Sequence, residues 1–265
     1  MPSIKINGCN YHYDIYGASE ETILFSHGLL WSGYLFHKQV AYFKDRYRIV
    51  TYDHRGQGQS EATAEGYEMD QLYEDAVALI EQLQLGKVHF VGLSMGGFVG
   101  MRLAARRSDL IRSLALTETS AQDEPNVVKY WFLNTIVKLF GINNLVVGPV
   151  MKIMFGEKFL QDPQRQAERA EWIGQLKQNK KTITRAVTGV IKRQDAEDEL
   201  YKITCPTIVV VGTQDKATTP AKAEFLHSKI PQSKLVYIEG AGHTSCIEEP
   251  GQYNAALEQF WKTLT

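Results

Sequence analysis

Cysteine is scarce in this sequence, and long apolar runs are absent. The 265 residues include only three cysteines, Cys9, Cys205 and Cys246, and their wide separation fits neither a disulfide framework nor a zinc site. The longest apolar run, residues 145–155, contains a proline and a lysine and is far shorter than the roughly 20 residues that span a membrane. We therefore expect no disulfide framework, no cysteine-based metal site and no membrane span.

An excess of charge of either sign is also missing. Lys and Arg number 29 against 30 Asp and Glu, which gives a formal net charge of −1. Proteins that bind nucleic acid usually carry a clear basic surplus, so we expect no nucleic-acid partner. With 44% hydrophobic residues the chain is too apolar to be disordered. The N-terminal residues lack the apolar run of an export signal, and together with the free cysteines this predicts a cytoplasmic location.

Strand-like and helix-like patterns alternate along most of the chain. The runs 22–26, 47–52 and 87–91 are almost wholly apolar, which is typical of strands buried on both faces of a parallel sheet. Residues 69–85 repeat apolar side chains at helical spacing between two of these strands. Further strands are predicted at 206–211 and 234–238, and a closing helix at 255–264. The pattern predicts an α/β fold with a mostly parallel central sheet flanked by helices.

One segment interrupts this alternation. Residues 122–195 are mostly helix-like and form a longer connection than a compact domain usually has. They hold 12 Lys and Arg against 7 Asp and Glu, a formal charge of +5, and solvated helix faces explain these charges more simply than a lid for acidic substrates. We predict a core of residues 1–121 and 196–265 with an inserted helical cap of residues 122–195.

The cap also carries large apolar side chains. Most of them should pack the cap helices together, but they are numerous enough to line an apolar acyl pocket as well. They are Trp131, Phe132, Ile136, Leu139, Phe140, Val150, Ile153, Met154 and Phe155.

The sharpest local signal is the run GLSMGG at residues 92–97. It follows a predicted buried strand and begins a helix, the context in which G-x-S-x-G indicates a nucleophilic serine on a tight turn. Ser94 would then stand exposed above the sheet. Gly92 and Gly96 are expected because side chains two positions before and after the serine would collide.

A serine hydroxyl needs a base, and seven histidines compete for that role. His243 ends the loop EGAGH after the last predicted strand, where glycines allow its side chain to reach a neighbouring strand end. His12 and His89 lie in strand patterns and should be packed. His37 and His227 lie in helical patterns and should be exposed. His243 is therefore the predicted base.

Three carboxylates could orient this histidine. Only Asp215 keeps the chain order Ser…Asp…His with the acid in the loop after the strand just before that of His243. Glu118 follows an earlier strand and could reach the same histidine from another side, and Asp53 also ends a strand. Asp215 is the predicted acid, with Glu118 as the main alternative.

Acyl transfer also needs donors for a tetrahedral oxyanion. One is expected to be the backbone N–H of Met95, directly after the nucleophile. The second is expected in the loop after the strand at 22–26, where Gly28 lets the backbone bend and Leu29 N–H is the candidate. His27 lies beside this turn, and its simpler interpretation is a residue that holds the loop rather than a catalytic one.

Taken together, these residues resemble the α/β-hydrolase superfamily, in particular its serine carboxylesterase, enol-lactonase and cofactor-free haloperoxidase-like members. The matching features run along nearly the whole chain: His27-Gly28, residues 53–60, the Ser94 turn, residues 212–220 and Gly242-His243. The resemblance implies the α/β-hydrolase fold with the helical insertion as a variable cap. Ser94 argues against dehalogenase-like and epoxide-hydrolase-like members, which use an aspartate nucleophile.

Two positions depart from the family pattern. Leu93 stands where His, Tyr or Gln often precedes the nucleophile, which affects only the packing of the turn. Leu30 stands where perhydrolase-active relatives have proline, so peracid formation is expected at most as a side activity.

The residues and the resemblance together predict a serine hydrolase that cleaves carboxylic esters of short to medium acyl chain through an acyl-enzyme intermediate. Ser94 would attack the carbonyl, His243 would transfer the proton, and Asp215 would hold the imidazolium. The expected partner is a small-molecule ester or lactone. This chemistry implies no metal and no organic cofactor.

Three alternatives stay open. An enol-lactonase or a carbon–carbon bond hydrolase would use the same triad. A small-ligand receptor or signalling module would keep the fold to bind rather than to turn over its ligand. Cys246, close to His243 in the sequence, is either a redox-sensitive group at the site or, as the simpler interpretation, a packed thiol.

Overall fold

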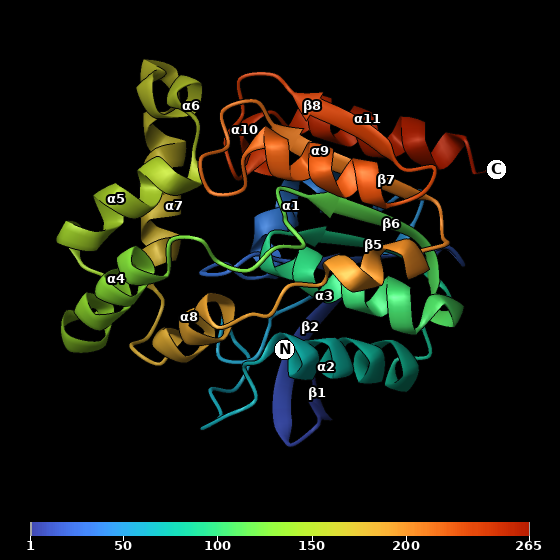
Figure 1. The fold of residues 1–265 in the computed structure, drawn as a ribbon, viewed down its shortest axis with the longest axis horizontal. Helices are drawn as coiled ribbons and strands as arrows, with labels where there is room; N and C mark the ends of the chain where they lie inside the picture. Colours follow the sequence, from blue (N-terminus) through green and yellow to red (C-terminus); the bar gives the residue numbers. More distant parts are fainter. Residues whose placement is uncertain (1, 265) are drawn as a thin grey trace.

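The computed structural model describes residues 2–264, which form an eight-stranded sheet with helices on both faces (Figure 1). The strands lie in the spatial order β1-β2-β4-β3-β5-β6-β7-β8. They are β1 Ser3–Ile6, β2 Cys9–Tyr16, β3 Thr22–Ser26, β4 Arg48–Tyr52, β5 Val88–Leu93, β6 Ile111–Thr117, β7 Thr207–Gly212 and β8 Lys234–Ile238. Only the pairs of β2 with β1 and with β4 are antiparallel. The predicted α/β fold with a mostly parallel sheet is confirmed.

Consecutive residues of the central strands point into two different apolar cores. In β3, Ile23 and Phe25 belong to one core and Leu24 to the other. The first core packs against α1 and α11, and the second against α2, α3 and α9. All residues of β3 are buried, as expected for a strand covered on both faces. The helices of this part, with short 3₁₀ turns, are α1 His37–Phe43, α2 Met69–Gln82, α3 Met95–Arg106, α9 Pro220–Lys229, α10 Ser245–Glu248, α11 Pro250–Lys262, η1 Gly33–Phe36, η2 Ser108–Leu110 and η4 Glu197–Lys202.

Two helix ends differ from their predicted positions. Helix α2 ends at Gln82, before the predicted end at residue 85, and the chain then turns through Gln84 and Gly86, both with positive φ. Helix α11 begins at Pro250 rather than at residue 255. Proline is favourable in the first turn of a helix because its missing N–H has no partner there in any case.

The segment between β6 and β7 consists of helices joined by loops. Residues 122–195, all of which the structure describes, contain no strand. Figure 1 shows α4, α5, α6 and α7 standing beside the sheet rather than on either of its faces. The two ends of the segment meet, since Ala196 N donates a 2.8 Å hydrogen bond to Ala121 O. The elements are α4 Val127–Phe140, α5 Asn144–Met154, α6 Glu157–Gln161, η3 Pro163–Arg165, α7 Gln166–Lys177 and α8 Ile183–Ile191.

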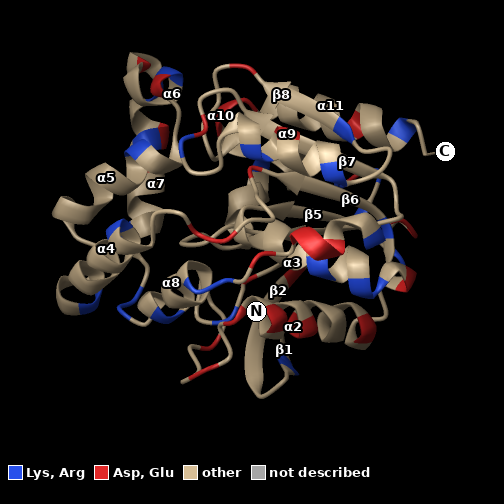
Figure 2. Ribbon diagram, viewed as in Figure 1, with Lys and Arg blue, Asp and Glu red and all other residues tan. Residues whose placement is uncertain are grey.

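Ion pairs join this helical segment to the rest of the chain. Lys38 Nζ lies 2.5 Å from Glu168 Oε1 on α7, and Lys216 Nζ lies 3.0 Å from Glu157 Oε1 on α6. Figure 2 shows both basic and acidic residues along α6 and α7. In both pairs the acid belongs to the helical segment and the cation to the rest of the chain, so these pairs join the two parts without offsetting the segment's positive charge. No helix within residues 2–264 has the length and apolar character needed to cross a membrane.

A buried ion pair fixes the loop that follows β4. Arg55 Nη2 lies 3.0 Å from Asp75 Oδ2, and the two side chains are only 5% and 1% exposed. Asp75, on α2, also accepts hydrogen bonds from Tyr11, Asn7 and Gln71. The loop is thus attached to a helix on the second face of the sheet.

Arg55→Met should lower the free energy of unfolding by about 3 kcal/mol, because it leaves the buried Asp75 carboxylate without its cation. Urea denaturation followed by circular dichroism measures this loss. Arg112→Met is the matched control, since Arg112 pairs with Glu21 at the surface and should cost less than about 1 kcal/mol. Similar losses in the two variants would contradict the role given to the buried pair.

Candidate functional site

Ser94 occupies the turn between β5 and α3 in a conformation that residues with a side chain rarely adopt. Its φ is 53° and its ψ is −110°. Two hydrogen bonds to the end of β6 hold it there: Ser94 N donates to Thr117 O at 2.9 Å, and Thr119 Oγ1 donates to Ser94 O at 2.8 Å. A backbone outlier held by its neighbours is a frequent feature of functional sites.

The glycines around this serine leave no room for side chains. A Cβ on Gly92 would lie 2.3 Å from Gly96 O, and a Cβ on Gly96 would lie 2.0 Å from Ser26 O on β3. Both contacts are with backbone atoms, which cannot rotate away. The start of α3 therefore packs directly on the ends of β3 and β5.

His243 and Asp215 meet beyond the ends of β8 and β7. His243 Nδ1 lies 2.9 Å from Asp215 Oδ2, and both side chains are almost fully buried. The carboxylate is further held by the backbone N–H groups of Ala217 and Thr218, which donate to Oδ1 at 2.8 and 2.9 Å. Because Nδ1 donates its proton to the carboxylate, Nε2 of His243 is free to accept one.

Thr218 is a neighbour of this pair that sequence reasoning missed. Its Oγ1 donates to Asp215 Oδ2 at 2.8 Å and lies 3.2 Å from His243 Nδ1. The available signal was its position three residues after an aspartate at a strand end, where hydroxyl and backbone groups commonly bond the aspartate side chain.

The two alternative acids lie elsewhere. Glu118 accepts a 2.5 Å hydrogen bond from Ser245 Oγ, while its Oε2 is buried without a partner among the described residues. Burial raises the pKa of the Glu118 carboxyl well above its usual value. Asp53 accepts hydrogen bonds from Gly33 N and Gln59 N and so ties two loops together. The structure thus brings Asp215, and neither alternative, to His243.

The loop after β3 runs beside the serine. A Cβ on Gly28 would lie 3.3 Å from Ser94 Cβ, so this backbone is in close contact with the nucleophile turn. Neither Leu29 N–H nor Met95 N–H donates a hydrogen bond to any of residues 2–264. Unpartnered backbone N–H groups in the turn of a serine and in the loop packed against it are the kind of donor that an oxyanion requires.

Two buried side chains hold this loop. The His27 ring bonds Gly28 O through Nδ1 at 2.7 Å and accepts from His54 N through Nε2 at 2.9 Å. Gln57 Oε1 accepts from Leu30 N at 2.8 Å and was not singled out from the sequence. Burial lowers the pKa of His27, which favours the neutral ring that this pair of bonds needs.

The remaining histidines largely match their predicted environments. His12 and His89 are buried within strands, and His227 is exposed on α9. His37 is half-buried instead of exposed, because its ring stacks on Tyr34 with centroids 4.7 Å apart.

Cys246 lies close to His243 in the sequence but is fully buried in the first core. Burial raises the pKa of its thiol well above the usual value, so the reactive thiolate is disfavoured. This environment matches the packed-thiol interpretation rather than a redox-sensitive group.

Ser94 and His243 both line a cavity of about 130 Å³ beneath the helical segment. No hydrogen bond joins the two side chains among the described residues. The lining is largely aliphatic and comes from α4, α5 and α8 together with Leu29 and Leu30. A mostly apolar lining with a few polar groups is typical of a ligand pocket.

Only some of the cap residues proposed from the sequence line this cavity. Val150, Ile153 and Met154 line this cavity, whereas Phe155 is packed in the first core. Helix α4 presents Tyr130, Leu133, Asn134 and Val137 to the cavity, which is the spacing of one helical face. Phe132, Leu139 and Phe140 fall on the other side and are 67%, 59% and 67% exposed.

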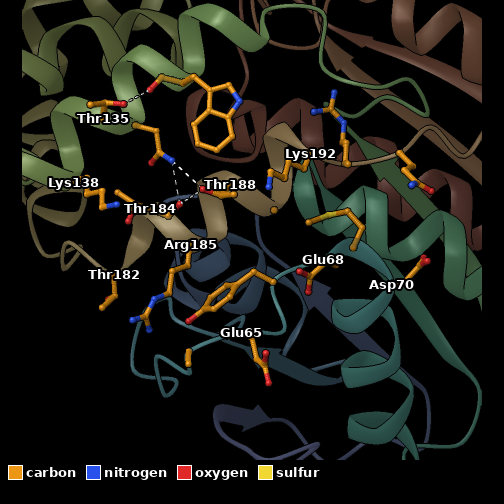
Figure 3. Close-up of a pocket in the computed structure, with 18 of the residues that line it drawn as sticks. Glu65, Glu68, Asp70, Thr135, Lys138, Thr182, Thr184, Arg185, Thr188 and Lys192 are labelled. Carbon is orange, nitrogen blue, oxygen red and sulfur yellow. Dashed lines mark hydrogen bonds between the residues drawn. The ribbon is translucent and has the colours of Figure 1, made fainter.

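A larger hollow lies outside this cavity. It has a volume of about 950 Å³ and lies between α4, α8 and the loop before α2 (Figure 3). Its walls carry charged side chains, among them Lys138, Arg185 and Glu68, and it contains neither Ser94 nor His243. Asn134 and Arg193 line both hollows, so they stand in the wall between them.

Comparisons with known proteins agree with this geometry. Residues 21–250 match the family model described as alpha/beta hydrolase fold. A 3-oxoadipate enol-lactonase from Acinetobacter baylyi is 29% identical over 95% of this chain and 92% of its own length. A putative carbamate hydrolase from Agrobacterium fabrum is 27% identical over 94% of this chain and 97% of its own. The crystal structure of an enol-lactonase from Burkholderia xenovorans superposes with a TM-score of 0.91 at 28% identity, covering 98% of this chain and 100% of that one.

Glu118→Gln should change how stability depends on pH. Because the pKa of the buried carboxyl is raised, the folded protein keeps a proton that the unfolded chain releases, so Glu118 lowers stability increasingly as the pH rises. A glutamine side chain at this position cannot ionise. The variant should therefore gain stability relative to wild type from about pH 5 to about pH 8 in urea titrations.

The exposed Glu65→Gln is the matched control and should show no such trend. A stability difference between Glu118→Gln and wild type that stayed constant with pH would contradict the buried, protonated state of Glu118.

Proposed function

The chain belongs to the alpha/beta hydrolase fold family, and on this basis we propose that it is a serine hydrolase that cleaves carboxylic esters of short to medium acyl chain. The observation that carries the proposal is the hydrogen-bonded pair of His243 and Asp215, which shares one small cavity with the strained Ser94. A serine, a histidine and a buried carboxylate in this relation are the groups that acyl transfer requires.

In the proposed mechanism, the substrate carbonyl lies between Ser94 and the two N–H groups. Nε2 of His243 takes the proton of the Ser94 hydroxyl as the oxygen attacks, and the imidazolium then protonates the leaving alkoxide. Asp215 stabilises the imidazolium through Nδ1. Water then repeats the sequence on the acyl-enzyme and releases the acid.

Leu29 N–H and Met95 N–H stabilise the oxyanion in this mechanism. Both groups are unpartnered before substrate binds, so they need not break existing hydrogen bonds to act. Loss of one such donor typically lowers turnover about 10²- to 10³-fold. The geometry of the loop held by His27 and Gln57 therefore matters as much as the triad.

Lactone opening is the second candidate, with the same residues in the same roles. The names of the Acinetobacter relative and the Burkholderia structure, both enol-lactonases, favour it. A lactone is a cyclic ester, so the attack on its carbonyl and the proton transfers are unchanged. The difference lies in the leaving group, which stays attached to the acyl chain.

Ser94→Ala should abolish hydrolysis of p-nitrophenyl butyrate. We expect kcat to fall at least about 10⁴-fold, because the acyl-enzyme can no longer form. The rate is measured at about pH 8 as the increase in absorbance at 405 nm from released p-nitrophenolate. Ser228→Ala, an exposed serine on α9, is the matched control and should keep full activity. Turnover by Ser94→Ala at the wild-type rate would rule out the proposed nucleophile.

Asp215→Asn and Glu118→Gln should have very different effects on the same assay. Asp215→Asn removes the charge that stabilises the imidazolium and should lower kcat about 10⁴-fold. Glu118→Gln should stay within about tenfold of wild type, because Glu118 does not touch His243. A severe loss confined to Glu118→Gln would reverse the assignment of the acid.

A further inference from the structure

The cavity beside Ser94 contains a single pair of opposite charges. Apart from His243, its lining residues include only one acid, Glu124, and one permanent cation, Arg193. Arg193 Nη1 lies 3.0 Å from Glu124 Oε2, and the two side chains are 3% and 11% exposed. An acyl group that entered this cavity would therefore meet aliphatic side chains and an ion pair that is already complete.

The guanidinium of Arg193 is occupied on nearly every side. Besides the bond to Glu124, its Nη1 donates to Val190 O at 3.0 Å, Nε donates to Gln122 O at 3.1 Å, and Nη2 donates to Asp123 O at 3.1 Å. Its face lies over the Phe98 ring at 4.6 Å. These four hydrogen bonds leave one guanidinium N–H free to bind a ligand. Bidentate pairing of arginine with a carboxylate needs two.

We propose that this cavity accepts uncharged acyl groups and rejects those that end in a carboxylate, and that Glu124 sets this selectivity by neutralising Arg193. The inference rests on the proposed ester hydrolysis at Ser94. A carboxylate buried in the aliphatic cavity would lose its hydration without gaining a cation, and it would also face the negative charge of Glu124.

Glu124 can be neutralised without dismantling this part of the fold. Arg193 keeps its three bonds to backbone carbonyls when Glu124 is replaced by glutamine. Glu124 Oε1 also accepts from Asn126 N at 3.0 Å, and a glutamine oxygen can accept the same bond. Glu124→Gln would therefore leave Arg193 in place as an unneutralised cation at the cavity wall.

Three p-nitrophenyl esters with the same six-carbon acyl backbone test the proposal. They are p-nitrophenyl hexanoate, the methyl ester of mono-p-nitrophenyl adipate, and mono-p-nitrophenyl adipate itself. The first two are neutral, and the third ends in a carboxylate. Wild type should cleave both neutral esters and should cleave the charged one with a kcat/KM at least about 100-fold lower than that of its methyl ester. Equal kcat/KM values for the charged ester and its methyl ester would overturn the proposal.

Glu124→Gln should raise kcat/KM for mono-p-nitrophenyl adipate about tenfold or more relative to kcat/KM for the hexanoate. Glu65→Gln removes an equal charge outside the cavity and should change neither value. A Glu124→Gln variant that cleaves hexanoate normally but gains nothing on the charged ester would refute the role given to Glu124.

Binding to the Ser94→Ala variant separates this inference from the proposed hydrolysis. Without turnover, the two neutral esters should raise its melting temperature and the charged ester should not. Absence of hydrolysis in wild type together with this binding pattern would refute the proposed function and support the selectivity. Hydrolysis in wild type together with equal stabilisation by all three esters would support the proposed function and refute the selectivity.

Discussion

The backbone of Ser94 is the constraint on which the rest of the site depends. A positive φ at a residue with a Cβ costs about 1–3 kcal/mol, and several features of the structure act to keep it. The ends of β3, β5 and β6 all contact this turn, through Ser26 O, Gly92 and the carbonyl of Thr117. Parallel pairing of these strands sets their ends level, so the sheet register directly determines where the serine stands.

The same edge of the sheet supplies every other group of the site. The loop after β3 brings Leu29, the loop after β7 brings Asp215, and the loop after β8 brings His243. These loops are held by side chains that take no part in the proposed chemistry, such as His27, Gln57 and Thr218. The rigid strands fix the distances between loops, and the buried side chains fix the shape of each loop.

Much of this arrangement is predictable from the sequence, because the groups follow strands at recognisable places. The apolar runs predict buried parallel strands, and GLSMGG, PTIVVVGTQD and EGAGH each mark a strand end with a reactive side chain. Asp215 is favoured over Glu118 because it follows the strand directly before that of His243, and the structure has it beside His243.

The parts that resist prediction depend on contacts between distant segments. Gln57 bonds Leu30 and Glu124 bonds Arg193 across long stretches of sequence, with no local pattern to mark either pair. Helix α4 is apolar almost all round, so its sequence does not tell which face meets the cavity and which, with Phe132 and Phe140, meets solvent. His37 is misjudged for the same reason, since its ring packs near Trp172 on the distant α7, with centroids 6.0 Å apart, as well as on the nearby Tyr34.

The contact between Ala121 and Ala196 allows the helical segment to vary in length without moving the strands of the sheet. The chain leaves the core after β6 and returns before β7 at almost the same point. The segment is therefore a loop whose two ends are in contact. Closing a longer loop adds little, about 0.6 kcal/mol for each doubling of its length. Changes in α4 and α8 can therefore reshape the roof of the cavity, but the end of α5 is fixed to the loop of His243, since Thr244 Oγ1 donates to Met154 O at 3.1 Å and Glu248 bonds both Gly156 N and Gly242 N. Substrate range can in this way vary through two helices of the segment, while the stretch after α5 stays bound to the catalytic loop.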